Sequence, residues 1–208
     1  MLDDNITALQ NGTIEVQTTN DKFDRFYVEN NDGSRSQVAT LDKYKASDGK
    51  TDLVTFPEKG QGFNRYSNKD LGGDHSVQPL VAAALFGAIA QTTELLPNVT
   101  VQLGDMSTTT GGKPGNEHNG GEKSHINGRN VDVRYISNNN ELRPLTINSN
   151  QFDKDANQIM VNNFFKFGFK NILSQRNSAG FLLNNTSNKG HYNHLHLQGF
   201  NPIFKIIK

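Results

Sequence analysis

Histidines gather at two places in this sequence of 208 residues, which contains six of them. His191, His194 and His196 lie within one stretch of six residues, and another histidine, His125, lies seven residues before Asp132. Imidazole nitrogens and carboxylate oxygens are common ligands of Zn²⁺ in proteins. Both segments also adjoin glycine-rich stretches. The pattern therefore predicts a metal site rather than scattered surface histidines.

Alternation along two expected strands indicates how these residues meet. Side chains two apart on a strand share a face, so His194 and His196 point the same way. Asp132 and Arg134 share a face of a second strand for the same reason. If the strands are neighbours, Asp132 and His196 converge, and His125 reaches them from the preceding turn. Two imidazoles and one carboxylate leave one tetrahedral position open, as in catalytic zinc sites, where the metal makes hydroxide available near neutral pH.

These segments resemble motifs of a known family. Residues 124–132 carry a Ser-His-x-x-Gly-x-x-x-Asp motif that resembles that of LAS-type metallopeptidases, which include D-Ala-D-Ala peptidases and hedgehog-like domains. Residues 190–196 match the closing His-x-x-His-x-His of the penicillin-insensitive murein endopeptidase branch. Residues 104–112 and 73–75 resemble further segments of that branch. The resemblance covers about residues 60 to 200.

The resemblance implies a role for each of these residues. It makes His125, Asp132 and His196 the zinc ligands. His191 lies where this branch has a histidine five residues before the last ligand, so it is the implied general base. His194 would line the site and stabilise the transition state, and it is the alternative base.

Two positions depart from the family pattern. Many LAS enzymes have an acidic base three residues before the last ligand, and Asn193, which cannot titrate, occupies that position. The murein endopeptidase branch usually has a histidine three residues before the first ligand, where this chain has Glu122. Glu122 would orient the site or act as a substitute base, or else be a solvated loop residue.

Four further residues are candidates with a structural alternative each. Asp105 would fix a ligand from behind or close a turn. His118 would contact substrate or lie free on a glycine-rich loop. His75 would belong to the site or begin a helix. Arg134 would bind a substrate carboxylate or form a structural ion pair.

The expected elements favour an α+β fold, with a small antiparallel sheet flanked by helices. Residues 1–58 form a β-rich N-terminal extension or linker, and residues 59–208 form the LAS-like zinc peptidase domain. Within that domain, apolar periodicity predicts helices and strands. The helices are expected over residues 77–96 and 155–167, and the strands over residues 99–103, 131–136, 169–173 and 194–198.

Composition excludes several classes of protein. The 21 Lys and Arg balance 21 Asp and Glu, so the chain lacks the basic footprint of a nucleic-acid binder. The absence of Cys excludes disulfide scaffolds and thiol nucleophiles. The longest apolar run, residues 80–90, is shorter than the ~20 residues of a membrane span. The first residues lack a signal-peptide pattern, so we expect another export route, or an excised domain, for a protein that acts in the periplasm or cell wall.

The resemblance implies a zinc-dependent endopeptidase that hydrolyses the peptide cross-links of peptidoglycan, with stem peptides as its substrate. One alternative is a D-Ala-D-Ala carboxypeptidase or dipeptidase. Another is a non-catalytic hedgehog-like module that binds zinc. Delivery as an antibacterial effector, with a matching immunity protein, or as part of a phage lysis system is consistent with the same sequence.

Overall fold

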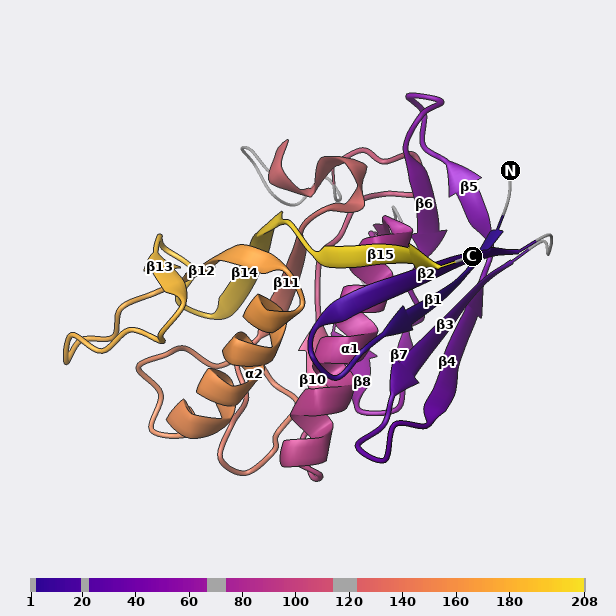
Figure 1. Cartoon of the computed structure of the whole chain (residues 1–208). Helices are drawn as coiled ribbons and strands as arrows, with labels where there is room; N and C mark the ends of the chain where they lie inside the picture. The colour runs from indigo at the N-terminus through magenta and orange to yellow at the C-terminus, as the bar shows by residue number, and fades with distance from the viewer. Residues whose placement is uncertain (1–2, 20–22, 67–73, 114–122, 208) are drawn as a thin grey trace.

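The computed structural model describes residues 3–19, 23–66, 74–113 and 123–207. Within this part of the chain, strands form three sheets and two α-helices lie among them (Figure 1). The helices are α1 (Pro79–Leu95) and α2 (Lys154–Lys166), and a short 3-10 helix covers Lys123–Gly128.

Two of the sheets are large, and both are mixed. The five-stranded sheet has the spatial order β15 (Ile203–Ile207), β2 (Thr13–Thr19), β1 (Asp3–Ala8), β3 (Asp24–Glu29) and β4 (Arg35–Leu41). The seven-stranded sheet has the order β13 (Thr186–Asn188), β12 (Phe169–Ser174), β14 (His194–Phe200), β11 (Val131–Arg134), β10 (Val101–Leu103), β8 (Phe63–Arg65) and β7 (Lys59–Gly60). The third sheet contains β5 (Lys43–Lys45), β6 (Asp52–Thr55) and β9 (Ser76–Val77).

The expected α+β fold, with a small antiparallel sheet flanked by helices, is therefore wrong, because the regular structure of the described residues is mostly β-strand and includes only two α-helices. The sequence pattern underestimates the sheets because β7 and β9 have two residues each and β5, β8 and β13 have three, too few for a visible alternation. The apolar run of β15 also lies far along the chain from its partner β2, with which it pairs in parallel.

Helix α1 runs through the core of the protein. Its residues 81–89 are all buried, and it packs against α2 and against β1 and β3 of the five-stranded sheet. A methyl group on Gly87 would lie 2.4 Å from the Phe167 ring and 2.7 Å from Ala8, so only glycine permits this approach. Pro79 begins the helix, where its missing N–H costs no hydrogen bond.

The first 58 residues share sheets with the rest of the chain. β15 forms the edge of the five-stranded sheet beside β2, and β9 pairs with β6. One continuous hydrophobic core contains residues of β1, α1, β11 and β14. The predicted division into an extension (residues 1–58) and a peptidase domain (residues 59–208) stays a prediction. Strands on either side of this boundary hydrogen-bond to one another.

No helix in the described ranges is both long enough and apolar enough to cross a membrane.

Candidate metal centre

The two strands that carry the predicted ligands are neighbours, which is the condition under which Asp132 and His196 are expected to converge. β11 pairs with β14 in an antiparallel register that places Asp132 directly opposite His196. Their opposite faces form core, since Val131, Val133, Leu195 and Leu197 are completely buried. Each strand therefore fixes one ligand side chain by burying its neighbours on the other face.

His125 joins this pair from the loop before β11. His196 Nδ1 donates a hydrogen bond to Asp132 Oδ1 over 2.7 Å, and His125 Nε2 lies 3.6 Å from the same oxygen. The three donor atoms all lie within 4.8 Å of one another. Ligand atoms 2.0–2.1 Å from a tetrahedral zinc lie about 3.3 Å apart. His125, Asp132 and His196 thus form a group that could hold a metal ion.

A tight turn after His125 directs its ring toward Asp132. Asn127 and Gly128 both have left-handed backbone angles, with φ of 63°. A Cβ at Gly128 would lie 2.6 Å from the backbone of Val77, so the position requires glycine. His125 Nδ1 donates to the carbonyl of Asn130 at 3.3 Å, which leaves Nε2 with the lone pair that faces Asp132.

The charge state of Asp132 suits a cation. Burial would raise its pKa, but the hydrogen bond from His196 and the neighbouring imidazoles of His125 and His194 outweigh burial and hold the pKa below its ordinary value. The carboxylate is therefore ionised at neutral pH and available as a ligand.

His191 and His194 form a second layer beside the ligand group. His191 Nδ1 and His194 Nε2 are 2.9 Å apart, and His194 Nδ1 lies 2.7 Å from Asn193 Oδ1. Since an amide oxygen only accepts, His194 carries its proton on Nδ1 and accepts at Nε2 from His191 Nδ1. This leaves Nε2 of His191 as the unprotonated nitrogen, and its ring stacks on that of His196 with centroids 5.3 Å apart.

Burial, together with the nearby charges of His194 and His196, lowers the pKa of His191 to about 4. The imidazole is therefore neutral at neutral pH and can accept a proton. Its loop is anchored by Tyr135, whose hydroxyl donates to the carbonyl of His191 at 2.7 Å. Burial raises the pKa of Tyr135, so this donor keeps its proton.

The remaining candidates lie at different places. Asp105 is buried and its backbone carbonyl accepts from the Asp132 amide at 3.0 Å, so it supports the ligand strand. His75 is half-buried and outside the ligand group, and burial lowers its pKa. His118 and Glu122 lie outside the described residues.

Arg134 is not part of a structural ion pair within the described residues. Its guanidinium lies over the ring of Tyr66, and its Nη1 donates to Gln102 Oε1 at 3.0 Å.

Four residues around the site have orienting roles that the sequence does not reveal. Asn130 orients His125, Asn193 orients His194, Tyr135 anchors the His191 loop and Tyr66 covers Arg134. Asn130 orients His125 through its backbone carbonyl, which every residue type has, so its side chain gives no sequence signal for this role. Tyr66 directly follows β8, whose parallel pairing with β10 the sequence does not reveal.

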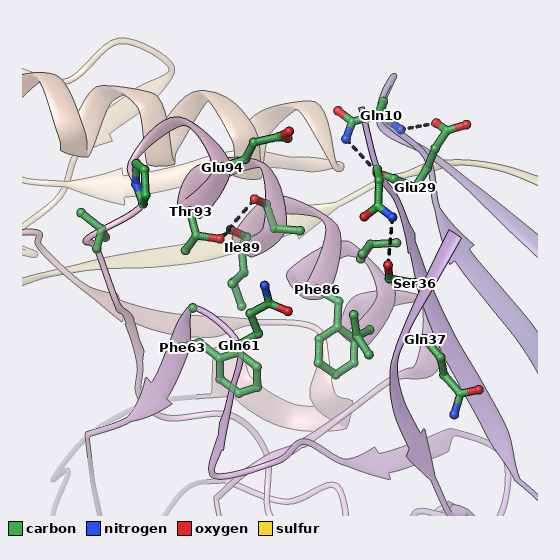
Figure 2. Close-up of a pocket in the computed structure, with 17 residues that line it drawn as sticks. Gln10, Glu29, Ser36, Gln37, Gln61, Phe63, Phe86, Ile89, Thr93 and Glu94 are labelled. Carbon is green, nitrogen blue, oxygen red and sulfur yellow. Dashed lines mark hydrogen bonds between the residues drawn. The ribbon is translucent and has the colours of Figure 1, made fainter. Parts of the chain in front are cut away.

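A separate cavity of about 590 Å³ lies between α1, the β3–β4 hairpin and the β7–β8 turn (Figure 2). Phe63 and Phe86 lie at its floor, and Gln10, Glu29 and Glu94 lie at its rim. None of its lining residues belongs to the ligand group or the histidines beside it. The cavity and the candidate metal centre are thus two distinct places in the molecule.

Comparison with models of known protein families gives no match for this chain, and a search of curated proteins gives none either. The chemistry of the site therefore has to be argued from its own residues. The two oriented imidazoles and the ionised carboxylate could hold a metal ion, and the neutral histidine beside them could accept a proton.

Proposed function

We propose that this chain is a zinc-dependent peptidase that hydrolyses the peptide cross-links of bacterial peptidoglycan. The observation that carries the proposal is the convergence of His125, Asp132 and His196, which the sequence motif singles out, into one buried donor group. His125 and His196 have side chains 1% and 5% exposed. Buried polar side chains cost free energy unless they find partners, and a bound metal would be such a partner.

Zinc is the metal that this donor set fits best. Two histidine nitrogens and one carboxylate oxygen match the three protein ligands of a catalytic zinc, and no thiolate is present in the sequence to favour a closed structural site. When bound, zinc would polarise the scissile carbonyl and supply hydroxide near neutral pH.

The chain's own residues would move the proton. His191 Nε2 is the free acceptor of the His191–His194–Asn193 chain and would take the proton of the attacking water. The same imidazolium would then protonate the leaving amine, which is general acid–base catalysis. His194, 3.8 Å from Asp132 and partly exposed, would donate to the developing oxyanion in its imidazolium form, because the Nδ1 proton of the neutral ring is already given to Asn193.

The substrate assignment comes from the motif resemblance and places the action of the protein in the periplasm or cell wall. Delivery as an antibacterial effector or a lysis enzyme, and an immunity protein in the first case, belong to the same proposal. Asn193 supports assignment to the murein endopeptidase branch. Because it cannot act as the acidic base of other LAS enzymes, a histidine has to accept the proton of the attacking water.

Digestion of purified sacculi, with products identified by mass spectrometry, tests the function. We expect the wild type to release monomeric muropeptides from cross-linked dimers. His196→Ala should release none, while His75→Ala, a histidine outside the ligand group, should match the wild type. Free D-Ala as the sole product would replace the endopeptidase with a carboxypeptidase. A metal-loaded protein with no products would contradict catalysis and favour a binding module.

A further inference from the structure

Arg134 is held in a fixed place on the face of the sheet that carries the metal ligands. Its guanidinium carbon lies 3.8 Å from the centre of the Tyr66 ring, and its Nη1 donates to Gln102, which is buried. Tyr66 is in turn fixed over Gly104, where a Cβ would lie 2.1 Å from the tyrosine oxygen. A guanidinium stacked in this way loses little further entropy when it binds a ligand.

The charge of Arg134 is not neutralised within the described residues, where no carboxylate lies at ion-pair distance from it. Arg35, in the five-stranded sheet, shows the ordinary structural alternative, because its Nη2 lies 2.6 Å from the carboxylate of Glu15. Burial lowers the pKa of Arg134, although the group stays charged at any working pH. A half-buried positive charge without an anion is costly, and a bound anion would relieve that cost.

The position of Arg134 relative to the metal ligands determines which part of a substrate its guanidinium would contact. It lies two residues after Asp132 and directly opposite His194 in the ladder between β11 and β14. Two strand residues span about 6.6 Å, and a peptide chain covers about 3.3–3.6 Å per residue. A substrate bond at the metal therefore puts one of the next two residues of the peptide beside the guanidinium.

We propose that Arg134, with Tyr66 and Gln102, forms a carboxylate-binding subsite that recognises a carboxylate on one of the first two residues after the scissile bond. This rests on the proposed function, since that bond is the one at the metal. Guanidinium and carboxylate pair through two parallel hydrogen bonds, which gives strength and direction. The amino carbon of a diamino acid in a cross-link carries such a carboxylate, and so does a terminal D-Ala.

The test compares two probes on full-length protein that carries His191→Ala to slow their hydrolysis. The probes are an acetylated peptide that ends in D-Ala-D-Ala with a free carboxylate and the same peptide with a C-terminal amide. Calorimetric titration should show that the acid binds at least about tenfold tighter than the amide. Arg134→Gln should weaken binding of the acid by about 10- to 100-fold and leave binding of the amide nearly unchanged.

Two further variants sharpen the result. Arg134→Lys keeps the positive charge but cannot make two parallel hydrogen bonds, so it should retain part of the preference for the acid over the amide. It also replaces Arg134→Gln as the test if the glutamine variant does not fold. Arg35→Gln removes an arginine that is already paired and should leave the preference intact. With His191 restored, Arg134→Gln should raise KM for the acid much more than it lowers kcat.

Absence of a preference for the acid, or a preference that survives in both Arg134 variants, overturns the subsite. The result is independent of turnover. A preference that depends on Arg134 supports the subsite even if no cross-link is hydrolysed. Hydrolysis of cross-links without any preference overturns the subsite and leaves the proposed function intact.

Discussion

Asp24 in the five-stranded sheet and Asp132 in the seven-stranded sheet are both removed from water, with side chains 0% and 13% exposed. Asp24 faces an ammonium group, since Lys43 Nζ lies 3.1 Å from its Oδ1 and 3.4 Å from Asp4. Asp132 faces imidazoles instead. Burial raises the pKa of Asp24 in spite of Lys43, whereas the histidines hold the pKa of Asp132 below its ordinary value.

The different partners of the two carboxylates distinguish a structural ion pair at Asp24 from a carboxylate at Asp132 that is available to bind a metal. The Lys43 ammonium is a permanent cation that neutralises Asp24 and has no lone pair to offer a metal. The imidazoles around Asp132 can be neutral and can ligate, so the carboxylate remains open to a cation from outside. We therefore expect variants in the first region to change stability, and variants in the second to change metal content and catalysis.

The largest expected effect is on catalysis in the second region. His191→Ala should keep zinc and fold, because His191 lies outside the ligand group, but lose about 10²- to 10⁴-fold in rate, the usual contribution of a general base. Rates of muropeptide-dimer cleavage and zinc content, measured on the same preparations, check this. Near wild-type turnover would move the base to His194, with Glu122 next.

The next effect is on stability in the first region. Lys43→Met leaves Asp24 buried without its counter-ion, and we expect a loss of about 3–5 kcal/mol in the free energy of unfolding. Zinc content per folded chain should not change. Denaturant unfolding measures the first quantity and elemental analysis the second. A loss of zinc from the folded variant would show that the two regions are coupled.

The deficit of Lys43→Met should depend on pH. Because burial raises the pKa of Asp24, the folded protein binds a proton that the unfolded chain has released at pH values just above 3.8. Without Lys43 this pKa rises further, so the deficit is complete at neutral pH and shrinks as the pH falls through the folded pKa. Unfolding at about pH 7 and pH 5 measures it. In the double variant with Asp24→Asn this pH dependence should vanish, and its persistence would point to another group.

The smallest effect concerns the anchor of the His191 loop. Tyr135→Phe removes one buried hydrogen bond, so we expect about 1 kcal/mol less stability and a fall in activity of a few-fold. Tyr44→Phe is the matched control, since its hydroxyl bonds Ser76 Oγ at 2.6 Å in the three-stranded sheet. The control should lose similar stability and no activity. Equal activity losses in both variants would contradict a specific role for Tyr135.

The sequence predicts the parts of this molecule that follow local rules. Two alternating strands with buried Val131, Val133, Leu195 and Leu197 are visible as patterns. The pairing and register that bring Asp132 to His196 are known only from the structure. Both helices begin and end within about two residues of the expected bounds, because an apolar run and a proline mark α1 and a 3.6-residue period marks α2.

Pairings between distant or very short strands are not visible in the same way. β15 joins β2, and β8 joins β10, through backbone hydrogen bonds that leave no side-chain signature. The Tyr66–Arg134 contact depends on the β8–β10 pairing, whereas the Asp24–Lys43 pair follows from the β3–β4 hairpin, in which Asp24 lies opposite Leu41. The site residues could thus be named from sequence, whereas the side chains that orient them required the three-dimensional structure.

The most direct test of the central claim is the zinc content of the full-length purified protein after incubation with a small excess of Zn²⁺ and removal of loosely bound metal. We predict about one zinc per chain for the wild type and for Lys43→Met, and almost none for His196→Ala in folded form. A folded wild type that retains no metal would contradict the account. Equal retention in His196→Ala would contradict it as well, by placing the metal elsewhere.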